Sequence, residues 1–389
     1  MSSTLEIKKR RDEEKEGCEM NLDIYKVKEI ENLKVWGRTT ECMEPITLFW
    51  TGSAVECNVR ASELWVEVET DYETYEPWMS IVINGAYVSR LVLNKGKQWI
   101  CLFRGMNKEV VKNVRVVKEV QAMSEDELHC MQIHGFKTDG TFLPIEEKQF
   151  KLEFIGDSIT SGEGSIGAII EEDWIPMWFS TQNNYAQMVA TEMDAEYRII
   201  SQSGWGVYTG WDNNPHSALP PYYEKVCGLL KGQRNEALGA QEAHDFTKWQ
   251  PDAIIINLGT NDGGAFNSPE WRDEKTGESH KQRLNEEGTF NEADLKRFEE
   301  AAKDFIVKVR KNNPHAQLVW AYGMLGYPML EAINRAVKDY QNLSGDEKIC
   351  ILKLPETNAT TVGARQHPGV LAHQIAAKCI VEKLNELLK

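Results

Sequence analysis

The sequence predicts an α/β protein in which a β-sandwich is followed by a doubly wound parallel sheet. Residues 21–148 carry a hydrophobic pattern with a period of two, which is typical of strands that bury one face. Across residues 149–389, continuous apolar runs alternate with helical patterns, as in parallel sheets covered on both sides. We therefore expect two domains with these bounds, preceded by a mobile tail over residues 1–20.

The composition is that of a globular protein with enough apolar residues to build sizeable cores. The 389 residues are 41% hydrophobic and 27% charged, and the formal net charge is −16. An acidic balance argues against nucleic acid or an anionic membrane as a partner, because both bind basic surfaces. No run reaches the roughly 18 apolar residues that a membrane span needs, so none is expected.

The tail and the cysteines predict a cytoplasmic location. In residues 1–20, four basic residues are followed at once by acidic ones, and no apolar stretch has the length of a signal peptide. The eight cysteines are scattered and form no Cys-x-x-Cys pair, which argues against a metal or redox motif. We therefore expect reduced thiols in a reducing compartment.

The first domain is predicted to be a sandwich of the jelly-roll type. In residues 63–70, apolar and mainly polar side chains alternate, which gives a strand with one buried face. Asn84-Gly85 lies between two apolar runs and is a strong hairpin signal. Many short strands separated by Gly and Asn turns favour a jelly roll. Further strands are expected at 98–103, 114–117 and 130–136.

The second domain is predicted from five apolar runs with helices between them. The strands are expected at 151–155, 197–201, 253–258, 317–322 and 349–354. Helices are expected around 185–193, 292–312 and 329–342, and the last helix is expected to begin at His367-Pro368, since Pro suits a first helical turn. Two long connections, 203–240 and 263–291, are expected to be functional or mobile.

The stretch FIGDSITSGEG, residues 154–164, holds the candidate nucleophile. A strand that breaks at Gly156 and presents Ser158 at the turn holds the hydroxyl above the end of the sheet, where it can meet a base and hydrogen-bond donors. The stretch is not a Gly-x-Ser-x-Gly elbow: Ser158 is flanked by Asp157 and Ile159, and Thr160 stands at the position of the second glycine. The alternative interpretation is an ordinary strand-to-helix turn capped by Asp157 or Ser158.

Three later segments each supply a further group at a strand end. IISQSGWGV (199–207) supplies Gly204, whose N–H can approach a ligand closely. NLGTNDGG (257–264) supplies Asn261, a side-chain donor, and ARQHPGVLAH (364–373) supplies His367. Taken alone, these residues could be a turn glycine, a loop cap and a helix cap. Together they would meet at one rim of a doubly wound sheet, where acyl transfer needs a nucleophile, a base and donors to the oxyanion.

These four blocks resemble those of the SGNH hydrolases. With the added N-terminal sandwich, the chain is similar to carbohydrate esterase family 2, which removes acetyl groups from plant cell-wall sugars, and the resemblance covers nearly all of the chain beyond residue 20. It implies a flavodoxin-like parallel sheet and a serine esterase of the acetylxylan esterase type that works through an acyl-enzyme. It also implies an acetylated oligosaccharide substrate and no cofactor or metal.

The resemblance also assigns the site residues. Ser158 would be the nucleophile and His367 the base. The oxyanion hole would consist of the backbone N–H groups of Ser158 and Gly204 and the side chain of Asn261. The acidic residues of the GDSIT and GTND blocks, Asp157 and Asp262, would order the turn and the loop through hydrogen bonds.

One position departs from the pattern of many superfamily members. They carry an acid three residues before the histidine, where this chain has Ala364. Some members of carbohydrate esterase family 2 use a Ser–His dyad in which a backbone carbonyl accepts from the imidazole, so we expect a dyad here. An acid from elsewhere, such as Glu356, is the alternative.

The expected substrate contacts and competing functions rest on fewer residues. Trp205, Tyr208 and Trp211 follow Gly204 and are expected to stack on a sugar, although they could also only pack a wide loop. A lipase or thioesterase of the same superfamily is the first alternative function. The second is a catalytically inactive carbohydrate-binding protein, which Ala364 and the large sandwich motivate. The sandwich would shape one wall of the cleft or mediate assembly into a homo-oligomer.

Overall fold

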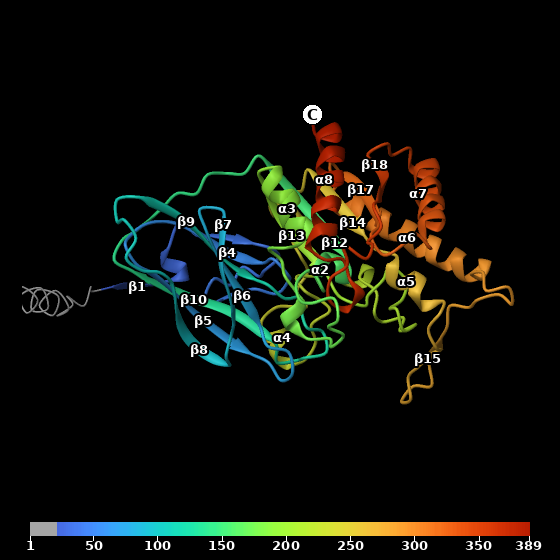
Figure 1. Ribbon diagram of the computed structural model, residues 1–389, viewed down its shortest axis with the longest axis horizontal. Coiled ribbons are helices and arrows are strands. Elements are labelled where there is room, and N and C mark those ends of the chain that lie inside the picture. Colours follow the sequence, from blue (N-terminus) through green and yellow to red (C-terminus); the bar gives the residue numbers. More distant parts are fainter. Residues whose placement is uncertain (1–21) are drawn as a thin grey trace, which may run out of the picture.

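The computed structural model describes residues 22–389 and contains an antiparallel sandwich beside a parallel sheet with helices (Figure 1). We call strands β1–β11 the sandwich and the elements from β12 to α8 the α/β part. The expected fold class, a β-sandwich joined to a doubly wound α/β sheet, is confirmed. The tail predicted over residues 1–20 lies outside the described residues.

The sandwich consists of two sheets in which every strand pair is antiparallel. The first sheet has the order β1 (Asp23–Lys26), β10 (Cys130–Thr138), β5 (Leu64–Asp71), β8 (Gly96–Phe103), and β3 (Ile46–Thr47) also pairs with β10. The second has the order β11 (Thr141–Leu143), β4 (Ala54–Arg60), β9 (Val111–Lys118), β6 (Trp78–Ile83), β7 (Ala86–Val92), and β2 (Lys34–Trp36) also pairs with β4.

Local sequence explains both features predicted for the sandwich. Leu64, Val66 and Val68 on β5 are fully buried in the core between the sheets, while the residues between them are partly exposed. The β6–β7 hairpin turns at Asn84 and Gly85, which have φ values of 51° and 78°. Two-residue hairpin turns of type I′ need this left-handed conformation at both positions.

The α/β part is built on five parallel strands, and all but the edge strand β18 are buried along most of their length. Their order is β13 (Ala195–Ser201), β12 (Phe150–Gly156), β14 (Ala253–Asn257), β17 (Gln317–Gly323), β18 (Ile349–Leu354). In chain order this is 2-1-3-4-5, the flavodoxin-like arrangement. The strand order reverses between β12 and β14, and ligands bind beyond the carboxyl ends of the strands at such a point.

Helices cover both faces of this sheet (Figure 1). Helices α3 (Tyr185–Glu192) and α8 (Val370–Leu387) pack on one face, and α6 (Glu292–Asn312) and α7 (Leu330–Ser344) pack on the other. The prediction that the last helix begins at His367-Pro368 is wrong. Gly369 is the N-cap of α8, and His367 has an extended backbone, with φ −85° and ψ 166°. This histidine is therefore held by a loop and not by the helix.

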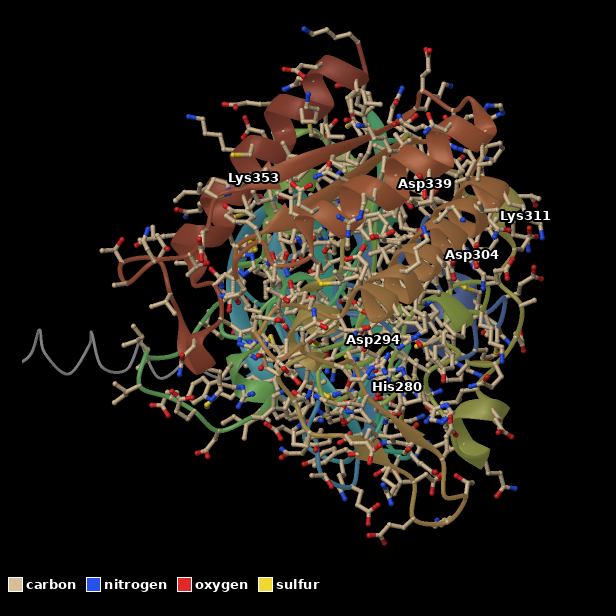
Figure 2. All side chains as sticks on the ribbon, turned by 90° about the vertical axis from the view of Figure 1, so that its right-hand side faces the viewer. His280, Asp294, Asp304, Lys311, Asp339 and Lys353 are labelled. Atoms are coloured by element: carbon tan, nitrogen blue, oxygen red, sulfur yellow. The ribbon has the colours of Figure 1, made fainter. Side chains whose placement is uncertain are left out.

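Short elements follow several strands. They are η1 (Val27–Glu29), α2 (Ser158–Ser161), η2 (Pro176–Trp178), η3 (Pro220–Tyr222), α4 (Gln233–Ala237), η4 (Phe246–Lys248), α5 (Thr260–Ala265) and η5 (Ala364–Gln366). The connection 263–291 also forms a small hairpin of β15 (Trp271–Arg272) and β16 (Ser279–His280), which projects from the α/β part (Figure 1). Figure 2 shows His280 at its base, near Asp294 in the first turn of α6.

The sandwich is fixed to the α/β part by a buried arginine. Arg38 follows β2, and its Nη2 lies 3.0 Å from Glu153 Oε2 on β12. Its guanidinium also lies over the rings of Tyr223 and Phe246, at 4.6 and 4.9 Å from their centroids. Charge pairing and ring contacts thus join two segments that are distant in sequence. Over residues 22–389, no helix has the length and apolar character that a membrane crossing requires.

Candidate active site

Ser158 lies at the carboxyl end of β12, as the first residue of the short helix α2. The strand ends at Gly156, where a Cβ atom would lie 2.0 Å from Thr160 Oγ1, so only glycine fits. Asp157 caps the helix, because its Oδ1 accepts from the Ile159 N–H at 3.1 Å. This tight turn points the start of α2 at the rim of the sheet and leaves Ser158 on the wall of a cavity.

His367 lies directly against Ser158, although 209 residues separate them in sequence. Its Nε2 is 2.9 Å from Ser158 Oγ, and its Nδ1 is 2.8 Å from the backbone oxygen of Arg365. A carbonyl can only accept, so the Nδ1 atom carries the proton and Nε2 is left as the acceptor for the serine hydroxyl. The ring is therefore set in the tautomer that a general base needs.

The carbonyl of Arg365 reaches the ring because the backbone turns back on itself. Arg365 and Gln366 have φ values of 54° and 56°, which non-glycine residues rarely adopt. Ala364 is buried and supplies no acid. Glu356 does not approach His367: it is exposed and lines a separate groove beside Thr357.

A carboxylate that the sequence analysis did not single out lies on the other side of the imidazole. Glu163 Oε1 is 3.8 Å from His367 Nε2 and 2.7 Å from Arg365 Nε. The residue is part of the same GDSITSGEG stretch as Ser158. The sequence offered one signal for this residue: an acid five positions after the nucleophile. A single turn of the chain is enough to bring such a residue back to the site.

The three expected oxyanion donors come from the ends of three neighbouring strands, and all line one cavity. Gly204 follows β13 with a φ of 78°, a conformation that favours glycine, and a Cβ there would press on the Trp211 ring at 3.0 Å from its Cδ1. Asn261 follows β14, and its Nδ2 donates to the Trp205 carbonyl at 2.9 Å and to Asp157 Oδ2 at 3.2 Å. The amide is thus fixed in place beside Ser158.

Two buried carboxyl groups support these loops. Asp262 accepts the N–H groups of Val207, Tyr208 and Thr209 at 2.9, 2.8 and 3.1 Å, which ties the loop after Gly204 to α5. Burial raises the pKa of Asp262 to about 6 against the lowering effect of those donors. Burial also raises the pKa of Asp157 to about 7, and the nearby charge of Asp262 adds to the rise.

The cavity has a volume of about 470 Å³ and both parts of the molecule form its walls. The sandwich therefore shapes one side of the cleft, one of the two roles expected for it. The aromatic rings of Trp174 and Tyr75 meet edge to face across this boundary, with centroids 4.9 Å apart. The sandwich contributes Tyr75, Met123, Ser124 and Glu125, and the α/β part contributes Ser158, Glu163, Trp174, Gln202, Ser203, Gly204, Trp205, Trp211, Asn261, Arg365 and His367.

Two of the three expected substrate contacts line this cavity and one does not. Trp205 and Trp211 are on its wall, and Trp211 is 57% exposed. Tyr208 instead packs against the core beside α6 and α7, and its hydroxyl lies 3.2 Å from His280 Nε2. The local pattern of aromatic residues could not reveal this, because His280 comes from the distant connection 263–291. Within residues 22–389, no cluster of His, Cys, Asp or Glu is arranged to hold a metal ion.

The assembled groups are suited to nucleophilic attack on a carbonyl. A hydroxyl contacts an imidazole of fixed tautomer, amide donors lie beside it, and the cavity is open enough to admit a substrate. A base, an activated nucleophile and fixed donors are the minimal set for acyl transfer.

Comparison with known proteins gives consistent matches. The model of the GDSL-like lipase/acylhydrolase family matches residues 154–347. An acetyl xylan esterase, Est2A, from the rumen bacterium Butyrivibrio proteoclasticus has a solved structure with a TM-score of 0.93 and 46% identity, and the match covers 94% of this chain and 98% of that one. A family two carbohydrate esterase from Clostridium thermocellum, solved with cellohexaose, shares the fold at a TM-score of 0.75 and 24% identity over 92% of this chain and 99% of that one.

Two characterised proteins match over part of their length. The cellulase/esterase CelE of Acetivibrio thermocellus is 25% identical over 344 residues, which is 87% of this chain and 37% of CelE. An acetylxylan esterase/glucomannan deacetylase of Cellvibrio japonicus is 26% identical over 235 residues, which is 59% of this chain and 61% of that protein. The matched regions thus span less than two thirds of either protein.

Proposed function

Because the chain belongs to the GDSL/SGNH hydrolases, in the acetylxylan esterase group of carbohydrate esterase family 2, we propose that it is a serine esterase that removes O-acetyl groups from plant cell-wall oligosaccharides. The observation that carries the proposal is the 2.9 Å contact between Ser158 Oγ and His367 Nε2 on the wall of an open cavity. The likeness to Est2A over nearly the whole chain supports the acetyl specificity.

The reaction proceeds through an acetyl-enzyme. His367 Nε2 takes the hydroxyl proton while Ser158 Oγ forms a bond to the acetyl carbon, and the electron pair of the C=O bond moves to its oxygen. When the carbonyl re-forms, the C–O bond to the sugar breaks and the imidazolium protonates the departing oxygen. Water then attacks the acetyl group, His367 accepts its proton, and acetate leaves as the serine regains its hydrogen.

The tetrahedral oxyanion is bound by the N–H groups of Ser158 and Gly204 and the amide of Asn261. The amide nitrogen of Asn261 donates to the Trp205 carbonyl and to Asp157 Oδ2, which holds it beside Ser158, and it exchanges one of these contacts for the oxyanion as the charge develops. Donors that are fixed before the reaction stabilise developing charge most effectively, and losing one costs on the order of 10²–10³ in rate.

An oligosaccharide fits the character of the cavity. Its volume of about 470 Å³ is within the range of small-molecule sites, and the rings of Trp205, Trp211 and Trp174 offer apolar faces beside polar groups. The esterase from Clostridium thermocellum was solved with cellohexaose, which supports a sugar chain as the bound partner.

The cysteines support action in a reducing compartment such as the cytoplasm, because the seven described cysteines are free thiols. Cell fractionation tests this location.

The test compares acyl groups on the same leaving group. We expect faster hydrolysis of aryl acetate than of aryl octanoate, and release of acetate from acetylated xylo-oligosaccharides. Faster octanoate cleavage would identify a lipase or thioesterase. A serine-directed phosphonate should label the Ser158 peptide, and Ser158→Ala should abolish both labelling and turnover without loss of fold. An unlabelled wild-type protein would indicate an inactive binding protein.

A further inference from the structure

We infer that Glu163 is a positioning residue that takes over the task of the missing triad acid, by a route through Arg365 and not through the imidazole Nδ1. The inference rests on the proposed esterase function. It deepens that function by identifying what holds and charges the catalytic base.

Glu163 is held rigidly between the nucleophile and the base. Only 2% of its surface is exposed. Its backbone N–H donates to the Ser158 carbonyl at 3.0 Å, which fixes it to the nucleophile turn. Its two carboxylate oxygens accept from Arg365 Nε at 2.7 Å and from Trp174 Nε1 at 3.3 Å. A buried carboxylate whose two oxygens both accept hydrogen bonds has little freedom to move, so it can define the position of Arg365.

Arg365 in turn carries the carbonyl that orients His367. Its φ of 54° lies in the left-handed region, which is unfavourable for a residue with a Cβ atom. Three further contacts oppose this strain: its Nε meets Glu163, its Nη1 donates to the Glu172 carbonyl at 2.6 Å, and its N–H donates to the Glu171 carbonyl at 2.7 Å. The contact with Glu163 connects this loop to the nucleophile turn through side chains, beside the backbone bond from the Ala364 N–H to the Gly164 carbonyl at 3.1 Å, so it helps to set the distance between base and nucleophile.

The charge of Glu163 also supports His367 as the base, because it stabilises the protonated imidazole. Its Oε1 lies 3.8 Å from His367 Nε2, the atom that becomes protonated when Ser158 attacks. The carbonyl of Arg365 is neutral and stabilises an imidazolium less than a carboxylate does. A carboxylate out of contact with solvent stabilises that cation more strongly than one in water. The guanidinium of Arg365 offsets part of this field, so we expect positioning to be the larger contribution.

Two variants separate the contributions. Glu163→Gln keeps an oxygen that can accept from Arg365 but removes the charge, whereas Glu163→Ala removes both. We expect kcat for aryl acetate to fall about tenfold in the first and about 100-fold in the second, with KM within about threefold of wild type, since orienting a general base contributes on the order of 10²–10⁴. The rate of phosphonate labelling of Ser158 should fall in parallel.

Glu172→Gln is the matched control, because its carboxylate lies nine residues after Glu163 and, within residues 22–389, accepts only from Gln366 Nε2, at 3.5 Å. It should keep wild-type kcat. If Glu163→Ala does not fold, the test uses Glu163→Gln and Arg365→Lys. The lysine lacks the guanidinium through which Arg365 contacts Glu163. Wild-type kcat in Glu163→Gln and Arg365→Lys, or a change in KM alone, would overturn the inference. Lack of activity and labelling in the wild-type protein would instead overturn the proposed function.

Discussion

Asp157 is a fully buried carboxyl group next to the nucleophile, and it does not touch the proton that Ser158 gives up. Its carboxyl oxygens accept hydrogen bonds from the Ile159 N–H at 3.1 Å and from Asn261 Nδ2 at 3.2 Å. Burial raises its pKa to about 7, far above the value of about 3.9 in an unfolded chain. The folded protein therefore holds a proton at this carboxyl group over a pH range in which the unfolded chain has lost it.

The raised pKa of Asp157 predicts a pH-dependent stability. A raised pKa contributes stability that is complete below about pH 4 and is lost as the pH rises through about 7. Asp157→Asn lacks this dependence, so its free energy of unfolding should rise relative to that of wild type between pH 5 and pH 8, by up to about 3 kcal/mol. Urea unfolding at a series of pH values measures the difference.

The control for this experiment is Asp304→Asn, which removes an exposed carboxylate on α6 (Figure 2). It loses the same formal charge without changing a buried group, so its stability relative to wild type should vary little with pH. Parallel pH profiles for wild type and Asp157→Asn would show that Asp157 ionises in the fold as it does in the unfolded chain.

The loop after β13 carries Gly204, an expected oxyanion donor, and part of the loop's support comes from the sandwich. Gln121 is fully buried just beyond β9, and its Oε1 accepts the Ser203 N–H at 2.8 Å, one residue before Gly204. Lys118 Nζ donates to the Gln121 carbonyl at 2.7 Å and fixes that segment. A sandwich residue thus positions an oxyanion donor of the α/β part.

This contact predicts a kinetic effect from a change in the sandwich. Gln121→Ala should lower kcat about tenfold or more and change KM less, because small displacements of catalytic groups are costly while substrate contacts remain. Gln132→Ala is the control, since Gln132 is also buried in the sandwich but donates to Thr47, away from the cavity. Equal kcat values for the two variants would contradict the role of Gln121. Steady-state kinetics with aryl acetate measure the effect.

At the same scale, the strands of both parts were predictable because each is a local pattern. β14 (Ala253–Asn257) is an uninterrupted apolar run buried on both faces, and β5 alternates as a strand with one buried face does. The start of α8 was not predictable, because two left-handed residues, Arg365 and Gln366, delay it until Val370. A backbone conformation that is held by contacts to the 163–172 segment leaves no periodic signal in the sequence.

The residues of the candidate site also fall into those that the sequence predicts and those that it does not. Ser158, Gly204, Asn261 and His367 each follow a strand of one parallel sheet, so topology alone brings them to the same rim. The residues that depend on contacts between distant segments were beyond such reasoning. Glu163 meets a loop that lies 202 residues later, and the sandwich wall exists only once the two parts pack together.

At the scale of the whole molecule, Arg38 is a buried charged contact between the sandwich and the α/β part. Its buried guanidinium lies over the rings of Tyr223 and Phe246 and pairs with Glu153, which also accepts from the Tyr223 hydroxyl at 2.6 Å. Because Gln121 contacts the loop before Gly204 and Tyr75 lines the cavity, we expect a contact that docks the sandwich to affect the candidate site as well.

Removing Arg38 leaves Glu153 buried without its cation, and breaking a buried pair in this way costs about 3–5 kcal/mol. Arg38→Met should therefore lower the free energy of unfolding by that amount, and Arg38→Met with Glu153→Gln, which removes both charges, should recover a large part of it. Calorimetry should show one cooperative transition for wild type and two for Arg38→Met if this contact couples the sandwich to the α/β part. A single transition with unchanged midpoint in Arg38→Met would instead mean that other contacts suffice to hold the sandwich and the α/β part together. Trp50 and the apolar contacts around it would then do so, since the Trp50 indole donates to the Val226 carbonyl at 2.7 Å.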